Sequence, residues 1–380
     1  MKKILIVIPG ISTGGVLSSL IALLNSSFTS RYQVHLFAMS SYRLANNDCL
    51  HKYILKCNKL SSLVYTQVAS SKGSFKCCLL LFKVLLRIPF FGGFLKSVID
   101  SLTIKKLEQE QYDYVISFQE TLSLQFVSKF SNPNKITWIH CDYSRIYSDF
   151  QYEMNIFSRY SKIIAVSEYT RSLFCQLFPT LSSKTYSIYN IMDEDHINTK
   201  SCDVIDDIRF DNKCFTIISV GRIVSIKQFH LIPKIAAEIQ ENGASFKWYI
   251  LGGGCERVAL QELQSAIKKY SVENSVFCLG NKLNPYPYYK KANLLVSVSA
   301  SEACPMIFNE AKILKLPIVT NNFGSAYEFI RDGRDGRICS IDKMSNVISD
   351  IIQNKRTFNP LISDNFKEKN IQQKLDDILN

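Results

Sequence analysis

Short apolar runs alternate with helical patterns along this chain. The first run, ILIVIP (4–9), is typical of a buried parallel strand, and VLSSLIALLN (16–25) has the pattern of a helix. The next run, YQVHLFAM (32–39), predicts a second strand. Strand, glycine-rich turn, helix and strand make a βαβ unit, so the chain is expected to begin with a parallel sheet.

The same alternation continues in two series. The first series adds strands at YDYVISF, KITWIH, KIIAVS and KTYSIYN (112–118, 135–140, 162–167, 184–190). The second series has CFTIISV, FKWYIL, SVFCLG, ANLLVSVS and LPIVTN (214–220, 246–251, 275–280, 292–299, 316–321). Two such series predict an α/β protein with two doubly wound, Rossmann-like domains. Ligands of these domains bind at the carboxyl ends of the strands, so a cleft between them would suit a nucleotide-containing substrate.

Composition shifts set the expected boundaries. We predict an N-terminal domain over 1–195, a polar and acidic linker over 196–213, and a C-terminal domain over 214–364. The last segment, 365–380, predicts a helix able to pack back on the N-terminal domain. Its apolar residues share one side of that helix: Phe366, Ile371, Leu375 and Ile378.

The charge is distributed unevenly over the 380 residues. Hydrophobic residues make up 47% and charged residues 21%, which excludes a disordered, collagenous or plain coiled-coil protein. The net charge is +12, and residues 1–190 hold 21 basic and 10 acidic residues against 24 and 23 in residues 191–380. The basic excess of the first half favours an anionic partner, either membrane lipid or nucleic acid.

A basic, apolar helix is predicted over 72–88. Lys72, Lys76, Lys83 and Arg87 fall within roughly 60° of one another on a helix, and the other faces are apolar. We expect residues 72–95 to contact the cytoplasmic membrane surface, which would make the protein peripheral on its inner face. The alternative is a core helix with one solvated edge. A membrane span is disfavoured because charges recur every few residues.

The N-terminal residues have a second interpretation. Lys2 and Lys3 precede an uncharged stretch over 4–30, which resembles a signal peptide. Pro9 and the glycines after it would interrupt a single apolar helix, so a strand is favoured there.

Metal and disulfide chemistry receive little support. The twelve cysteines include no Cys-x-x-Cys pair, and several lie in apolar runs, such as Cys214 and Cys278, so we expect buried, reduced thiols in a cytosolic protein. Asp193-Glu194-Asp195 contains an Asp-x-Asp pair, but it lies beside the predicted linker rather than after a strand within a domain. We therefore expect neither a metal nor a cofactor.

The strongest candidate site follows the strand ANLLVSVS. Glu302 and Glu310 flank a predicted helix start at Pro305. The backbone N–H groups of the first helical residues would be unpaired and would form an anion site: Met306, Ile307 and Phe308. Carboxylates beside a phosphate site suit sugar hydroxyls, so this loop fits a ligand with a diphosphate between sugar rings.

Two cations follow the first strand of the second series. Arg222 and Lys227 would project from its carboxyl end and could offset the charge of a leaving diphosphate. An ordinary surface pair is the alternative. The turn LGGGCE (251–256) lacks the full dinucleotide spacing. It either allows a close backbone approach to a ligand or is merely a tight turn, and Gly14-Gly15 has the same two interpretations. In the first half, His140 ends a strand and could bind a sugar hydroxyl or remain structural.

These motifs together resemble glycosyltransferase family 4, whose members have the GT-B fold of two Rossmann-like domains facing a cleft. The similarity extends over nearly the whole chain. It rests on GISTGGV, WIHCD, IAVSEYTR, SIYNIMD, SVGRIVSIK, YILGGGCE, NPYPYYKKANLLVSVSASEACP, NEAKILKLPIVT and GSAYEFIRDGRDG (10–16, 138–142, 164–171, 187–193, 219–227, 249–256, 284–305, 309–320, 324–336).

The resemblance implies a role for each matching position. Arg222 and Lys227 would hold the donor diphosphate, Glu302 the hydroxyls of the donor sugar and Glu310 the ribose. His140 would face the transferred sugar. The remaining donor-binding positions would act through their backbone: Gly15, Gly221, Gly252, Pro305, Met306, Ile307 and Phe308. Members of this family retain the anomeric configuration without a metal in the site, and many act on lipid-linked glycans.

The resulting hypothesis is a retaining glycosyltransferase. It would move a hexose or N-acetylhexosamine from a nucleotide-diphosphate sugar, expected to be a UDP-sugar, to a lipid-linked or cell-surface glycan. A nucleotide-sugar epimerase of the same architecture is the alternative, with Asp142 or Glu168 as its carboxylate. A nucleic-acid binder is disfavoured because the basic residues lie on an apolar helix.

Overall fold

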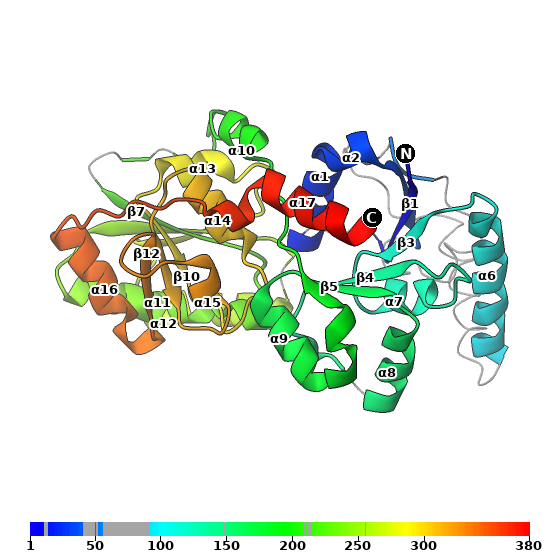
Figure 1. Cartoon of the computed structure of the whole chain (residues 1–380). Helices are drawn as coiled ribbons and strands as arrows, with labels where there is room; N and C mark the ends of the chain where they lie inside the picture. Colours follow the sequence, from blue (N-terminus) through cyan, green and yellow to red (C-terminus); the bar gives the residue numbers. More distant parts are fainter. Residues whose placement is uncertain are drawn as a thin grey trace. The chain divides into compact units, whose positions relative to one another are not determined.

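The computed structural model describes residues 1–10, 14–40, 50, 52–55, 91–147, 149–208, 210–211, 214–254 and 256–380. These residues form two compact units (Figure 1). The first consists of Met1–Tyr189 and Gln372–Asn380, and the second of Asn190–Ile371. The helix predicted over 72–88 lies outside the described residues.

The first unit is built on a six-stranded sheet with the order β2-β1-β3-β4-β5-β6. Its strands are β1 (Lys3–Ile8), β2 (Gln33–Ala38), β3 (Tyr114–Ser117), β4 (Lys135–Ile139), β5 (Lys162–Ala165) and β6 (Thr185–Ser187). Each neighbouring pair is parallel. Its helices include α1 (Gly15–Asn25), α2 (Phe28–Arg31), α6 (Phe91–Glu108), α7 (Leu122–Val127), α8 (Phe150–Ser158) and α9 (Glu168–Leu177). All six strands end at one edge of the sheet, because they run in the same direction.

The second unit has a six-stranded parallel sheet of its own, with the order β12-β11-β10-β7-β8-β9. The strands are β7 (Phe215–Val220), β8 (Phe246–Leu251), β9 (Val276–Gly280), β10 (Leu294–Ser297), β11 (Ile318–Asn321) and β12 (Gly336–Cys339). The helices are α10 (Glu194–Lys200), α11 (Ile232–Glu241), α12 (Arg257–Lys269), α13 (Tyr286–Lys291), α14 (Met306–Ile313), α15 (Ala326–Phe329) and α16 (Ile341–Gln353). Strands β7 and β10 are direct neighbours, so the loops that follow them start side by side.

The predicted α/β class and the strands predicted from apolar runs are confirmed. The sequence pattern missed β12, a short strand that contains Arg337. This strand starts at Gly336, where an added Cβ atom would stand 1.7 Å from the carbonyl oxygen of Ile318 on β11. Only glycine therefore fits at the point where β12 joins the sheet.

The helix α10 overlaps the start of the segment predicted as a polar and acidic linker. Asp193 caps α10 by accepting a hydrogen bond of 2.9 Å from the His196 N–H group. Ile197 is buried in a small cluster with Met192 and Met306. This helix has seven residues and buries only Ile197, so its sequence shows no hydrophobic period.

The prediction of buried thiols is wrong for Cys278. This residue is exposed because β9 is an edge strand with one open face, on which alternate side chains point outward. Cys202 is exposed as well, and Cys304 is half-buried, where desolvation raises the pKa of its thiol to about 12.

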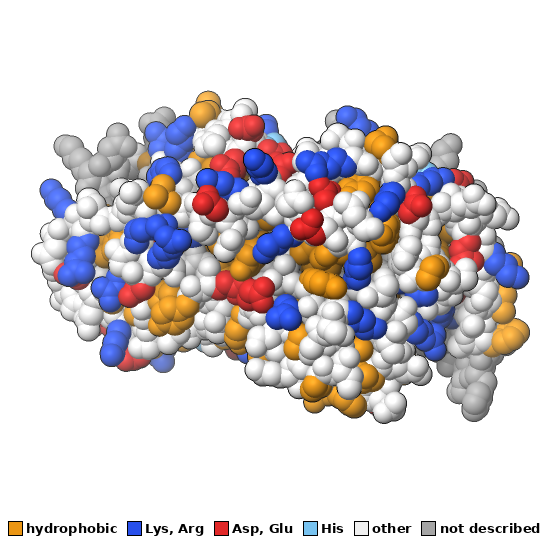
Figure 2. Space-filling model, in the orientation of Figure 1, with side chains coloured by type: hydrophobic (Ala, Val, Ile, Leu, Met, Phe, Trp, Pro, Cys, Tyr) orange, Lys and Arg blue, Asp and Glu red, His pale blue; other side chains and the backbone are white. Residues whose placement is uncertain are grey.

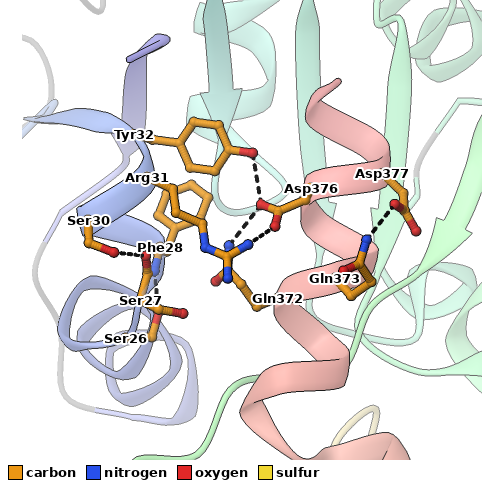
Figure 3. Close-up of polar contacts among 10 residues, drawn as sticks. All are labelled: Ser26, Ser27, Phe28, Ser30, Arg31, Tyr32, Gln372, Gln373, Asp376 and Asp377. Atoms are coloured by element: carbon orange, nitrogen blue, oxygen red, sulfur yellow. Dashed lines mark hydrogen bonds and ion pairs between the residues drawn. The ribbon is translucent and has the colours of Figure 1, made fainter.

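Of the four apolar residues predicted to share one side of a C-terminal helix, Ile371, Leu375 and Ile378 are buried on α17 (Glu368–Leu379). Phe366 is also buried, but it lies in the 3-10 helix Asp364–Phe366 before α17. From Gln372 onward α17 belongs to the first unit, where Asp376 pairs with Arg31 and accepts a 2.9 Å hydrogen bond from the Tyr32 hydroxyl (Figure 3). The Tyr114 hydroxyl donates to the Leu379 carbonyl at 2.9 Å. Asp376 is buried. Together these contacts attach α17 to α2, to Tyr32 after it, and to β3.

Asp376→Ala should destabilise the first unit by about 1–3 kcal/mol, because it leaves the Tyr32 hydroxyl buried without its acceptor. The neighbouring Asp377 is exposed and contacts Gln373, so Asp377→Ala is a matched control that should change stability by less than about 0.5 kcal/mol. Denaturant unfolding followed through Trp138 on β4 measures both effects. Equal losses in the two variants would contradict the role given to Asp376.

Candidate functional site in the second unit

Lys227 and Glu302 form an ion pair although 75 residues separate them. Lys227 follows β7 and Glu302 follows the neighbouring strand β10, and the Ala300 N–H group donates to the Ile226 carbonyl at 2.9 Å between the two loops. The side chains are 18% and 13% exposed. The sequence predicted Lys227 and Glu302 as parts of two separate motifs, and the structure brings their side chains together where both are largely shielded from solvent.

Two serines hold Glu302 in place. The Ser299 hydroxyl donates to Oε1 of the carboxylate at 2.7 Å, and the Ser325 hydroxyl donates to the Glu302 carbonyl at 2.6 Å. The carboxylate therefore has both a cation and a hydroxyl as partners. Sequence reasoning did not identify either serine, because nothing in the pattern distinguishes them from other loop serines.

Glycines allow the loops after β7 and β8 to approach each other closely. Gly221 has a φ of +152°, and the Lys227 chain passes 3.6 Å from where its Cβ atom would stand. A Cβ atom on Gly252 would stand 2.5 Å from the Gly221 carbonyl oxygen. The glycine-rich turn thus has a packing reason of its own, beside the donor-binding role implied for Gly221 and Gly252.

Arg222 is exposed on the same loop. Its aliphatic chain passes 3.4 Å from where a Cβ atom of Gly254 would stand. The loop is fixed by Glu256, whose carboxylate accepts from the Ser225 N–H group at 3.0 Å and from its hydroxyl at 2.8 Å. These hydrogen bonds hold the pKa of Glu256 below its usual value. Arg222 therefore extends from a rigid turn.

The start of α14 differs in one respect from the expectation. Pro305 precedes the helix as predicted, but the Phe308 N–H group donates to the Pro305 carbonyl at 3.0 Å. The prediction that this amide is unpaired is therefore wrong, because the first turn closes tightly on itself. Within the described part of the chain, the N–H groups of Met306 and Ile307 have no acceptor, and they keep the anion-binding capacity of the helix start.

Glu310 is buried within α14, where Oε2 accepts a 2.8 Å hydrogen bond from the Tyr289 hydroxyl of α13. Burial raises the pKa of Glu310 to about 7, and the hydrogen bond from Tyr289 opposes that rise. Glu310 therefore changes charge near neutral pH. Tyr289 is a functional candidate that the sequence did not reveal, because only the packing of α13 on α14 brings the two residues together.

Gly15 and His140 belong to the first unit, whereas the other predicted site residues belong to the second. Gly15 is the first residue of α1, after Gly14 with a φ of +142°. His140 follows β4, and desolvation lowers the pKa of its imidazole.

The described residues also bear on metal binding, on a membrane span and on a further pocket. Asp193 acts as a helix cap, and no group of three or more potential metal-binding side chains occurs in the described ranges. None of the helices described is both long and apolar enough to cross a bilayer. A pocket of about 710 Å³ is lined by Cys202, Val204, Lys290 and neighbouring residues, but by none of the predicted site residues.

Comparison with known proteins finds similarity to glycosyltransferases. Residues 203–370 match the family model of glycosyl transferases group 1. An uncharacterized glycosyltransferase of Methanocaldococcus jannaschii is 27% identical over 221 residues, which are 55% of this chain and 53% of that protein. A Campylobacter jejuni N-acetylgalactosamine-N,N'-diacetylbacillosaminyl-diphospho-undecaprenol 4-alpha-N-acetylgalactosaminyltransferase is 28% identical over 173 residues, 45% of this chain and 44% of that protein. The chain thus spans about half the length of the curated relatives it matches.

The fold has a counterpart among solved structures. The crystal structure of Anabaena HepE in complex with UDP and glucose matches with a TM-score of 0.75 at 16% identity, covering 100% of this chain and 99% of that one. This likeness confirms the GT-B fold expected from the sequence. Residues 203–370 are thus similar to the group 1 glycosyl transferases.

Glu310→Gln should remove a pH dependence of stability in the second unit. The folded-state pKa of about 7 lies above the unfolded value of 4.5, so wild-type stability falls as the pH rises between these values. The variant should therefore gain up to about 3 kcal/mol relative to wild type between pH 5 and pH 8. Denaturant unfolding of both proteins, followed through the buried Trp248, measures this difference, and a constant difference across that range would contradict it.

Proposed function

We propose that the protein is a retaining glycosyltransferase that uses a UDP-sugar. It transfers a hexose or N-acetylhexosamine to a lipid-linked or cell-surface glycan. The observation that carries the proposal is the shielded Lys227–Glu302 pair at the carboxyl ends of β7 and β10, within a group 1 glycosyl transferase domain.

The donor diphosphate would be held by charge and by backbone donors. Lys227 and Arg222 supply two cations, and the amides of Met306 and Ile307 supply unpaired N–H groups at a helix start. Binding of the diphosphate to Lys227 would free the Glu302 carboxylate to accept hydrogen bonds from sugar hydroxyls. Glu310 would accept from the ribose hydroxyls. The HepE structures with UDP and glucose and with UDP-glucose support a UDP-sugar as donor.

In the transfer step, the bond between the anomeric carbon and the diphosphate oxygen breaks as a bond to the acceptor oxygen forms. The acceptor hydroxyl attacks from the face that the diphosphate leaves, and its proton passes to the departing phosphate. Arg222, Lys227 and the α14 amides would stabilise the negative charge on the leaving group. The proposal requires no metal and no cofactor.

The epimerase alternative receives no support from its carboxylates. Asp142 accepts from the Ser144 hydroxyl at 2.5 Å and pairs with Arg145 at 3.1 Å. Glu168 accepts from Ser187 and lies 3.7 Å from Arg171. Both groups are held by local contacts, and the family match favours transfer.

Lys227→Ala should lower turnover by at least about a hundredfold, because the leaving diphosphate loses its shielded cation. The same variant should lose the thermal stabilisation that UDP gives to the wild-type protein. Lys234→Ala removes an exposed lysine from α11 and should preserve both properties. A screen of UDP-sugars, with UDP release as the readout, provides the assay. Wild-type turnover in Lys227→Ala would exclude the proposed donor site.

The membrane is the proposed location of the acceptor. The Campylobacter jejuni relative is named for a diphospho-undecaprenol substrate, which supports a lipid-linked acceptor here. The described helix α6 carries Phe94, Val98 and Leu102 at a spacing of four residues, exposed by 68%, 38% and 54%. Hydrophobic side chains are visible over this helix (Figure 2). Lys105 and Lys106 follow one turn later and are exposed, which suits an anionic bilayer surface.

Replacing Phe94, Val98 and Leu102 together by serine should reduce flotation with vesicles that contain anionic lipid by at least about fivefold, because the apolar anchor is lost. Val258→Ser removes an exposed apolar side chain from α12 in the other unit and serves as control. Vesicles of neutral lipid should bind both proteins more weakly. Undiminished flotation of the triple variant would exclude α6 from the membrane contact.

A further inference from the structure

We propose that Glu120 is a positioning residue for His140, the residue that the family resemblance places against the transferred sugar. The inference rests on the proposed function, because it takes His140 as the residue that meets a sugar of the transfer reaction. Glu120 follows β3 and His140 follows the neighbouring strand β4, so both lie at the carboxyl edge of the sheet.

The imidazole of His140 has one engaged and one unengaged nitrogen. The backbone carbonyl of Phe118 accepts a hydrogen bond from the ring, and the two aromatic rings lie 5.0 Å apart. Nε2 is shielded from solvent and has no hydrogen-bond partner among the described residues. We therefore assign the Phe118 contact to Nδ1, which would carry the proton and leave a lone pair on Nε2. A buried acceptor without a donor is costly, and a substrate hydroxyl is a group that would satisfy it.

Glu120 fixes the backbone that carries this ring. Its side chain is buried, and its Oε2 accepts a 2.9 Å hydrogen bond from the His140 N–H group. The Cys141 thiol also donates to this carboxylate. No Lys or Arg in the described ranges forms an ion pair with Glu120. A buried side chain that accepts from the His140 N–H group points to a role in placing His140.

The backbone beside Glu120 is strained. Thr121 has a φ of +86° and a ψ of −119°, a conformation that a β-branched residue rarely adopts. Such strain persists where the surrounding structure enforces it, and it occurs preferentially at functional sites. Here it turns the chain between β3 and α7 while Glu120 remains buried against the residues after β4.

The test is a double-mutant cycle in the full-length protein. Glu120→Ala and His140→Ala should each lower kcat at least tenfold, and the double variant should be no slower than His140→Ala, because Glu120 acts through His140. Stabilisation by UDP, which carries no transferred sugar, should be the same in all variants. Glu120→Gln keeps an oxygen acceptor for the His140 N–H group and should recover activity to within about fivefold of wild type.

Glu108 provides a matched control. Its carboxylate accepts from the Ser131 N–H group at 2.7 Å in the same unit, so Glu108→Ala also removes a backbone acceptor and should leave kcat within about twofold of wild type. If the losses from Glu120→Ala and His140→Ala multiply in the double variant, Glu120 does not act through His140 and the inference is wrong.

A spectroscopic measurement tests the positioning independently of activity. Nitrogen-15 spectra of histidine-labelled protein, assigned with His140→Ala, should show His140 as the Nδ1-protonated tautomer. Glu120→Ala should convert this signal to a mixture of tautomers, and an unchanged signal would overturn the inference. Absence of sugar transfer by the wild-type protein, with the tautomer result as expected, would instead reject the proposed function and the sugar assignment while preserving the positioning role.

Discussion

The ion pair between Lys227 and Glu302 is the contact on which the site of the second unit depends. It exists because β7 and β10 are parallel neighbours, so the residues that follow them emerge at the same edge of the sheet. Charges so well shielded from water need partners, and the ammonium, the carboxylate and the Ser299 hydroxyl satisfy one another. A diphosphate would enter a place where the protein has already assembled opposite charges.

Three glutamates differ in the groups that contact them: Glu302 and Glu310 in the second unit, and Glu120 in the first. Glu302 is paired with a cation, whereas Glu310 is held only by the Tyr289 hydroxyl among its described contacts and has a pKa raised to about 7. Glu120 accepts from a backbone N–H group and a thiol. The partners differ in kind: Glu302 contacts a cation, Glu310 a tyrosine hydroxyl, and Glu120 a backbone N–H group.

Much of the site could be predicted because its residue types are informative in themselves. Arg222 and Lys227 after a strand, and two glutamates around a proline-initiated helix, identify the elements that carry them. Tyr289, Ser299 and Ser325 could not be predicted in this way, since tyrosines and loop serines occur throughout the chain and only the folded structure brings these three into contact with Glu310 or Glu302. The Phe308 amide was misassigned for a related reason, because the local turn geometry, and not the helix start alone, decides which N–H groups remain unpaired.

The sequence by itself determined the two series of parallel strands, the order of strand and helix, the C-terminal helix that buries Ile371, Leu375 and Ile378, and the resemblance to a glycosyltransferase family. These features follow from hydrophobic period and short motifs, which are local properties of the chain. The tertiary structure alone decided that β12 completes its sheet through Gly336, that Asp376 contacts Arg31 and Tyr32, and that Glu120 supports the backbone of His140. Each of these depends on an approach between segments distant in sequence, whose distance and direction a local pattern does not contain.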